Sequence, residues 1–185
     1  MAIAQTVNFQ IARSLRILYY VRAAFNIIWV TLISIYAYSS PEITAALLII
    51  YPIWDVVGTI ADILINRGTG SLTPQYVNLA MSSIAAIAVG FAIQNGVPQA
   101  LIVFGIWAMI AGIIQLIMGL QRQKALGGQW PIIISGGQST IGGLSFIVLS
   151  NSPLGVASLA GYSAFGAFYF ILAAITITKR LRKGY

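Results

Sequence analysis

The chain contains no cysteine and no histidine, and only three of its 185 residues are acidic. Without cysteine or histidine there is no thiolate nucleophile, no imidazole base and no zinc, haem or iron–sulfur ligand set of the usual kind. The three acids, Glu42, Asp55 and Asp62, are the entire supply of carboxylate side chains. These absences predict a protein that is not an enzyme and that holds no metal ion and no cofactor.

Charged residues of both signs are scarce as well. They make up 7% of the chain, against about 25% in a typical soluble domain. Hydrophobic residues make up 59%, and the mean hydropathy is +0.91. This composition excludes a soluble globule, a disordered chain, a coiled coil and a disulfide scaffold, and it predicts a helical membrane protein.

Six apolar stretches are each long enough to supply the roughly 20 residues that cross a bilayer. They cover residues 17–38, 43–65, 76–93, 99–120, 130–150 and 154–178. Open strands would leave backbone groups unpaired in lipid, so each stretch is expected to be a helix. The predicted fold class is therefore all-α and integral to the membrane, with one six-helix transmembrane domain at residues 17–178.

Nine of the ten basic residues fall on one side of this arrangement. They are Arg13, Arg16, Arg67, Arg122, Lys124, Lys179, Arg180, Arg182 and Lys183. The positive-inside rule places that side, with both termini, in the cytoplasm. Topology and anionic lipid then explain the net charge of +7 without a nucleic-acid partner. We expect a multi-pass protein of the bacterial inner (plasma) membrane whose partners are membrane lipids.

The two ends of the chain lie outside the predicted spans. Residues 1–16 lack the basic, apolar and cleavable order of a signal peptide. A hydrophobic residue recurs at every fourth position of this segment, at Ile3, Val7, Ile11 and Leu15. The spacing favours a short amphipathic helix on the inner leaflet, although a frayed segment would fit equally. Residues 179–185 are expected to form a basic cytoplasmic tail.

The spans group into three hairpins, at residues 17–65, 76–120 and 130–178. Each outer turn contains a proline, at Pro41, Pro98 and Pro153, and these prolines are 57 and 55 residues apart. A glycine recurs in the second span of each hairpin, at Gly58, Gly112 and Gly166. Three parallel repeats of a two-helix unit, related by a pseudo-threefold axis along the membrane normal, are the simplest account.

Glycine, tryptophan and proline recur in apolar context within the second and third hairpins. The segments concerned are residues 105–115, 128–131, 135–137 and 142–143. With the three proline turns, they resemble the HdeD-like acid-resistance membrane proteins, domain of unknown function 308, over nearly the whole chain. The resemblance implies a six-span bacterial inner-membrane protein without catalytic residues, and acid-stress resistance belongs to the family's best-known member. The first hairpin departs from the family, because charged residues lie inside its spans.

These charged residues are Arg22, Asp55 and Asp62. Each costs about 3 kcal/mol inside the membrane unless it has a partner or water. Counted back from the outer proline, the depth of Arg22 falls between the depths of the two aspartates, within reach of its side chain. One interpretation is a structural ion pair that joins the first span to the second. The other is a charge site of a small proton, ion or solute transporter, in which Asp55 changes charge while Arg22 stays positive.

Further polar residues share this depth and form a predicted polar layer in the inner half of the membrane. They are Asn26, Ser83, Gln115 and Gln138. Interhelical hydrogen bonds contribute around 0.6 kcal/mol each in membranes, so structural bonding is the default interpretation. The outer half of the membrane domain contains almost no hydrogen-bonding side chains, over residues 84–93, 100–108 and 154–160. We therefore expect no open channel, and at most a cavity open to the cytoplasm.

Glycine is abundant, at 18 residues, and small residues let helix backbones approach closely. The glycines expected at helix contacts are Gly58, Gly112, Gly136, Gly137, Gly142, Gly143 and Gly166. Four of them lie in the span at residues 130–150. That span is therefore expected to be central to packing, either within the chain or between copies of it.

No phosphate-binding loop, Rossmann glycine set or serine elbow is present. Asp55 and Asp62 lie on one span, whereas an intramembrane aspartyl protease needs aspartates on facing helices. The favoured hypothesis is a non-enzymatic inner-membrane protein with a stress-associated or structural role that acts through helix association. Its possible partners are further copies of the chain or a larger membrane complex. The alternatives are a small transporter that uses Arg22, Asp55 and Asp62, and an accessory subunit of a larger complex.

Overall fold

The computed structural model describes residues 2–68 and 70–183, with side chains described for 6–68 and 70–182. These residues form six α-helices and one short 3-10 turn, without a strand among them. The elements are α1 (Ala2–Tyr36), α2 (Pro41–Ile65), α3 (Thr73–Ala92), η1 (Ile93–Asn95), α4 (Val97–Ala125), α5 (Trp130–Val148) and α6 (Pro153–Lys183). All six α-helices are long and apolar enough to cross a membrane. The prediction of an all-helical chain with six spans is thereby confirmed at this level.

Proline sets the starts of five helices. One proline stands in the first two positions of each of α2 to α6, at Pro41, Pro74, Pro98, Pro131 and Pro153. Proline suits the first turn, because its φ is already helical and its missing N–H would have no partner there. Gly96 precedes α4 with a φ of 106°, a conformation that only glycine adopts readily.

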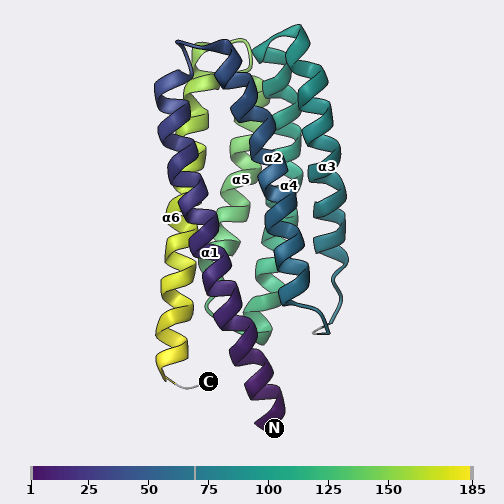
Figure 1. Ribbon diagram of the computed structural model, residues 1–185, viewed down its shortest axis with the longest axis vertical. Coiled ribbons are helices and arrows are strands. Elements are labelled where there is room, and N and C mark those ends of the chain that lie inside the picture. The colour runs from purple at the N-terminus through teal and green to yellow at the C-terminus, as the bar shows by residue number, and fades with distance from the viewer. Residues whose placement is uncertain (1, 69, 184–185) are drawn as a thin grey trace.

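The helices form a closed bundle in which each packs against its neighbours in the chain (Figure 1). The ring closes where α1 runs along α6, and α1 begins and α6 ends at the same end of the bundle (Figure 1). The most extensive contacts, α4 with α5 and α1 with α6, join helices of different hairpins. Among neighbouring α-helices, α1 and α2 have the least extensive contact.

The first and last helices extend beyond the length that a membrane requires. The 35 residues of α1 give about 52 Å, against about 30 Å of hydrocarbon. We predicted either a short amphipathic helix or a frayed segment for residues 1–16; in the structure residues 2–16 are helical and continue into the first span as part of α1. Ile11 and Leu15 are buried in a cluster with residues of α6, which explains the continuity, whereas the side chain of Ile3 lies outside the described residues. The basic tail continues α6 as far as Lys183, and residues 184–185 are also outside them.

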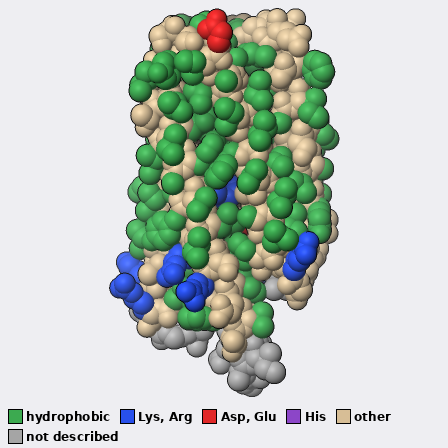
Figure 2. All heavy atoms as spheres, in the orientation of Figure 1, with side chains coloured by type: hydrophobic (Ala, Val, Ile, Leu, Met, Phe, Trp, Pro, Cys, Tyr) green, Lys and Arg blue, Asp and Glu red, His purple; other side chains and the backbone are tan. Residues whose placement is uncertain are grey.

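On the face shown in Figure 2, hydrophobic side chains spread over the bundle between its two ends, and most of the basic side chains gather at one end. Aliphatic side chains such as Ile28, Ile87 and Val148 are 61–72% exposed on the surface of the bundle. Lipid tails would cover such a surface, so the exposure that would be costly in water is expected in a membrane.

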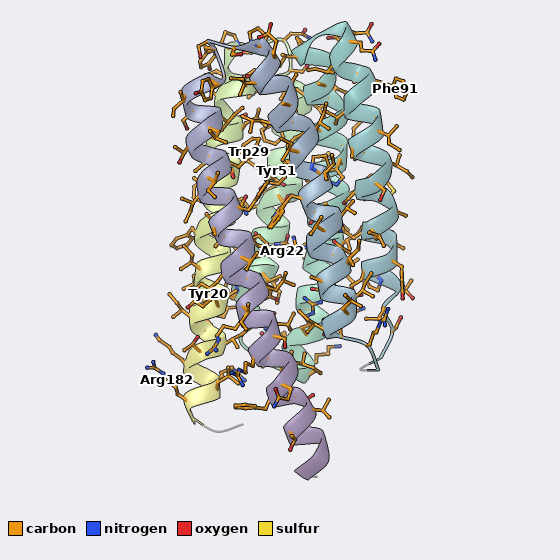
Figure 3. All side chains as sticks on the ribbon, in the orientation of Figure 1. Tyr20, Arg22, Trp29, Tyr51, Phe91 and Arg182 are labelled. Atoms are coloured by element: carbon orange, nitrogen blue, oxygen red, sulfur yellow. The ribbon has the colours of Figure 1, made fainter. Side chains whose placement is uncertain are left out.

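An apolar core fills the half of the bundle next to the proline turns. Its largest fully buried side chains are Trp29, Ile33, Leu48, Leu101, Phe104, Phe146 and Leu159. Figure 3 labels Trp29 above Tyr51 and Arg22, toward that end. The polar side chains of the interior lie on the other side of this core. The core therefore separates them from the end of the bundle that carries the proline turns.

Candidate intramembrane polar cavity

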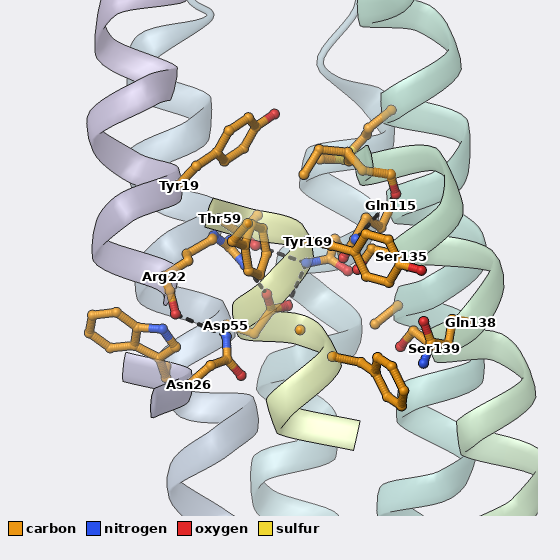
Figure 4. Close-up of a pocket in the computed structure, with 18 of the residues that line it drawn as sticks. Tyr19, Arg22, Asn26, Asp55, Thr59, Gln115, Ser135, Gln138, Ser139 and Tyr169 are labelled. Carbon is orange, nitrogen blue, oxygen red and sulfur yellow. Dashed lines mark hydrogen bonds and ion pairs between the residues drawn. The ribbon is translucent and has the colours of Figure 1, made fainter. Parts of the chain in front are cut away.

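A cavity of about 90 Å³ lies in the bundle below the apolar core, and all six α-helices contribute lining residues. About three water molecules would fill this volume. Figure 4 shows Arg22, Asn26 and Asp55 facing Gln115, Ser135 and Gln138 across it. The polar residues of different hairpins therefore surround one common space.

Arg22 and Asp55 form an ion pair at the wall of the cavity. The Nη1 of Arg22 lies 2.8 Å from Oδ1 of Asp55, and their side chains are 15% and 14% exposed. The other carboxylate oxygen, Oδ2, accepts hydrogen bonds from Asn78 at 2.7 Å and from Ser82 at 2.8 Å. Three donors from α1 and α3 thus surround one carboxylate of α2, which offsets the cost of removing the charges from water.

The guanidinium of Arg22 has a confined position. A Cβ at Gly58 would lie 2.5 Å from its Nη2, so the guanidinium would have to shift if any side chain replaced this glycine. The ring centroid of Phe170 lies 5.6 Å from Cζ, within the range of a cation–π contact. The described side chains and backbone give Arg22 no acceptor besides Asp55, although a guanidinium carries five N–H donors. Figure 2 shows a basic side chain recessed in the apolar face, at the height where Figure 3 labels Arg22.

The network extends from Asp55 into α3 and α4 through residues that the sequence analysis missed. Asn78 also donates to Thr59 Oγ1 at 2.8 Å, and the indole N–H of Trp107 donates to Ser82 Oγ at 2.9 Å. Asn78 and Ser82 stand four positions apart, which puts both on one face of α3. That spacing was the signal in the sequence that could have identified them.

Ser83, which we predicted in the polar layer, is not among the residues that line the cavity. Its hydroxyl donates to the carbonyl of Leu79 in its own helix at 2.8 Å. One residue along a helix corresponds to a rotation of about 100°. The adjacent Ser82 therefore points inward in its place, fully buried.

Asn26, another predicted member of the layer, is hydrogen-bonded through both its nitrogen and its oxygen. Its Nδ2 donates to the carbonyl of Arg22 at 2.9 Å. Its Oδ1 accepts from the hydroxyls of Tyr51 and Ser163. Asn26 thus connects α1 to α2 and α6, and Gly166 packs beside it, 3.3 Å from Oδ1 to the position of a Cβ.

Two glutamines line the cavity with little internal bonding. Gln115 donates to the carbonyl of Ile132 at 3.4 Å, near the limit for a hydrogen bond. Gln138 has no hydrogen-bond partner within the described part of the chain. The buried indole N–H of Trp54, another lining residue, also lacks one there. The cavity therefore contains polar groups for which the described residues supply no hydrogen-bond partner.

Asp62 contacts Arg122 in the structure, not Arg22. The Nη2 of Arg122 pairs with Oδ1 of Asp62, and these side chains are 9% and 5% exposed. We interpreted Arg122 from the sequence only as a marker of the cytoplasmic side. It lies inside α4, which continues to Ala125, and it faces the bundle because Asp62 compensates its charge.

Residues of two further segments surround this second ion pair. Asn66 donates to Oδ1 of Asp62 at 3.2 Å. Arg122 donates to the hydroxyl of Tyr19 at 3.5 Å, and Tyr19 donates to Oε1 of Gln129 at 2.9 Å. The cluster connects α1, α2 and α4 with the turn before α5 at the basic end of the cavity.

The glycines that we predicted at helix contacts have three different environments. Gly112, Gly136 and Gly143 lie in the α4–α5 contact, where a Cβ at Gly112 would be 2.7 Å from the carbonyl oxygen of Gly136. Gly142 packs 3.1 Å from the ring of Tyr162, whereas Gly137 has only one atom within 4 Å. Gly58 and Gly166 accommodate the polar side chains Arg22 and Asn26, as described above.

Comparison of the chain with protein-family models, with curated proteins and with solved structures finds no match. The resemblance to the HdeD-like family therefore stays a prediction based on the glycine, tryptophan and proline segments.

Proposed function

We propose that the protein is a small, non-enzymatic, multi-pass transporter of the bacterial inner membrane that binds a small uncharged polar solute in the cavity. The observation that carries this proposal is a polar cavity inside a membrane-spanning bundle whose lining groups are only partly bonded to one another. Polar residues inside a membrane are costly, so they typically mark a functional site.

Structural hydrogen bonding explains only part of the lining. Asn26, Asn78 and Asp55 each bond to neighbouring helices, as residues that hold helices together should. Gln138 and Trp54 bond to nothing among the described residues. The indole N–H of Trp54 is buried, and an unsatisfied buried polar group costs about 1–3 kcal/mol, which a bound solute or water would offset.

The charges around the cavity favour an uncharged solute. Arg22 is paired with Asp55, and Arg122 with Asp62, so the lining has no uncompensated charge to receive an ion. The groups left without a partner include N–H donors of Trp54 and Arg22. These donors suit a solute with carbonyl or hydroxyl oxygens, and the volume of about 90 Å³ suits one of the size of urea or acetamide.

Asp55 is less suited to the charge-changing role that we considered from the sequence. Both of its oxygens are engaged by three donors, one of them a guanidinium. Releasing a cation or taking up a proton there would break this network. A solute-binding cavity with a permanent Arg22–Asp55 pair requires no such change.

The orientation and the internal repeat are part of the proposal. Basic side chains at one end of the bundle (Figure 2) support a cytoplasmic location for that end and for both termini. The ring of neighbouring helices (Figure 1) is compatible with three parallel hairpins. The stress-associated role, the accessory-subunit role and the association with further copies or a larger complex stay predictions from the sequence.

Solute flux into proteoliposomes tests the proposed function. Stopped-flow light scattering should show faster entry of urea or acetamide than in protein-free vesicles, with no acceleration of acetate or choline. Gln138→Leu removes a lining amide without breaking an internal hydrogen bond, so it should slow the flux several-fold. Gln94→Leu makes the same change at an exposed residue of η1 outside the cavity and should leave the flux unchanged. Equal rates with and without the protein would refute the proposal.

A further inference from the structure

We propose that the cavity is entered from the basic end through a second cavity, the vestibule, and that the Arg122–Asp62 ion pair is the gate between the two. The identity of the solute that would pass the gate rests on the proposed function, but the gate's control of access for water and aqueous reagents does not. Arg122 carries the inference, because it is the one residue of the described chain that lines both cavities.

The vestibule has a volume of about 130 Å³ and lies beside the ends of α2 and α4. Its polar lining residues are Asn8, Asn66, Ser71, Gln75, Gln121 and Arg122. Gln75 is only 5% exposed, and its Oε1 has no partner in the described structure. A buried carbonyl oxygen of this kind is normally hydrogen-bonded, so the vestibule is suited to water or to a polar solute.

The gate is a compact cluster, not a single contact. Arg122 is held by Asp62 and by the hydroxyl of Tyr19, which is itself bound to Gln129. These residues come from α1, α2, α4 and the turn before α5. In this position Arg122 borders both the cavity and the vestibule.

Opening the gate requires the guanidinium of Arg122 to leave Asp62. The vestibule offers it another acceptor, because Gln75 Oε1 is unpartnered and lines the same space. Replacing only one partner of a buried ion pair with a neutral residue leaves the charge of the other partner uncompensated. The informative variant therefore replaces both partners with neutral residues, Asp62→Asn, which keeps the shape of the side chain, together with Arg122→Gln, which shortens it.

Cysteine labelling tests the gate directly, because the chain has no cysteine of its own. Ser135→Cys introduces a thiol at a residue that lines the cavity and is 9% exposed. Ser71→Cys introduces one in the vestibule. A membrane-impermeant sulfonated thiol reagent is added to sealed vesicles on the side from which Ser71→Cys reacts, and the rate is measured for each single-cysteine protein.

We expect Ser135→Cys to react slowly while the ion pair is intact. In the Asp62→Asn/Arg122→Gln background its rate should rise at least about tenfold, the factor that corresponds to a barrier lower by about 1.4 kcal/mol. The rate of Ser71→Cys should not change. The matched control, Arg22→Gln/Asp55→Asn, removes the other ion pair and should leave the labelling of Ser135→Cys slow.

Two results would overturn the gate. One is labelling of Ser135→Cys as fast as that of Ser71→Cys with the ion pair intact, and the other is an unchanged rate in the neutral background. Gel filtration and unchanged labelling of Ser71→Cys verify that the neutral background is folded. Urea flux is a separate readout, so faster labelling without any flux would support the gate and refute the proposed function.

Discussion

One added methyl group at Gly143 should weaken the contact between α4 and α5. A Cβ at this position would lie 2.5 Å from the carbonyl oxygen of Gly105 and 2.6 Å from the amide nitrogen of Met109. Ordinary contacts of a Cβ begin at 3.4 Å, so the two helices must separate by almost 1 Å. Both neighbouring atoms belong to backbone, so no side-chain rotation can relieve the overlap.

The expected magnitude follows from two opposing effects of Gly143→Ala. Overpacking typically costs about 1–3 kcal/mol, whereas alanine in place of glycine in a helix gains about 0.5–1 kcal/mol. The two ranges leave a net loss of about 0–2.5 kcal/mol, so we expect the free energy of unfolding to fall by about 1 kcal/mol. Gly137→Ala is the matched control in the same helix, because its nearest atom would be 3.9 Å away, and it should leave stability unchanged or raise it.

Titration of the two variants with sodium dodecyl sulfate in mixed micelles, followed by circular dichroism, measures this difference. The midpoint of Gly143→Ala should lie below that of the unaltered protein, and the midpoint of Gly137→Ala should not. If both variants unfold at the same midpoint, the close approach of α4 and α5 that the glycines permit does not contribute to stability, and the reasoning fails.

Three further predictions concern the ion pair, the topology and the unbonded indole. Asp55→Asn leaves Arg22 unpaired, so it should lower the free energy of unfolding by about 3–5 kcal/mol in the same titration. The double variant Arg22→Gln/Asp55→Asn should recover part of this loss. Unchanged stability of Asp55→Asn alone would contradict the role of the pair. In cells, Ser39→Cys should react with an impermeant thiol reagent only from the periplasm and Ser71→Cys only from the cytoplasm, and reaction of both from one side would refute the proposed topology. Trp54→Phe removes an N–H without a partner, so it should keep or raise thermal stability while slowing urea flux, and unchanged flux would exclude Trp54 from solute binding.

The helices could be predicted from the sequence because an uninterrupted run of about 20 apolar residues is rare outside membrane-spanning helices. The ends of α1 and α6 could not. Residues that leave the hydrocarbon no longer need to be apolar, so a helix that continues into water has no hydropathy signal at the boundary. Burial of Ile11 and Leu15 against another helix then decides how far α1 extends, and this is a tertiary effect.

The candidate site was predictable where one turn fixes the relative depth of two residues. Arg22 and Asp55 belong to the same hairpin, and counting from Pro41 places them within reach of each other. The same count also allowed Arg22 to reach Asp62, whose partner in the structure is Arg122 of the second hairpin. Depth alone does not give the direction of a side chain around its helix, which is why Ser83 was predicted where Ser82 lies.

The two ion pairs make α2 the element that connects the cavity to its gate. Asp55 and Asp62 stand seven residues apart, about 10 Å along the helix axis, and both lie after Pro52, in the part of α2 without a further proline. Their partners come from different helices, Arg22 from α1 and Arg122 from α4. The two pairs share α2 but no residue, so the guanidinium of Arg122 can leave Asp62 by rotation of its own side chain while Arg22 stays bound to Asp55. The gate can therefore open without a change in the Arg22–Asp55 pair, which is why removal of that pair should leave the gate closed.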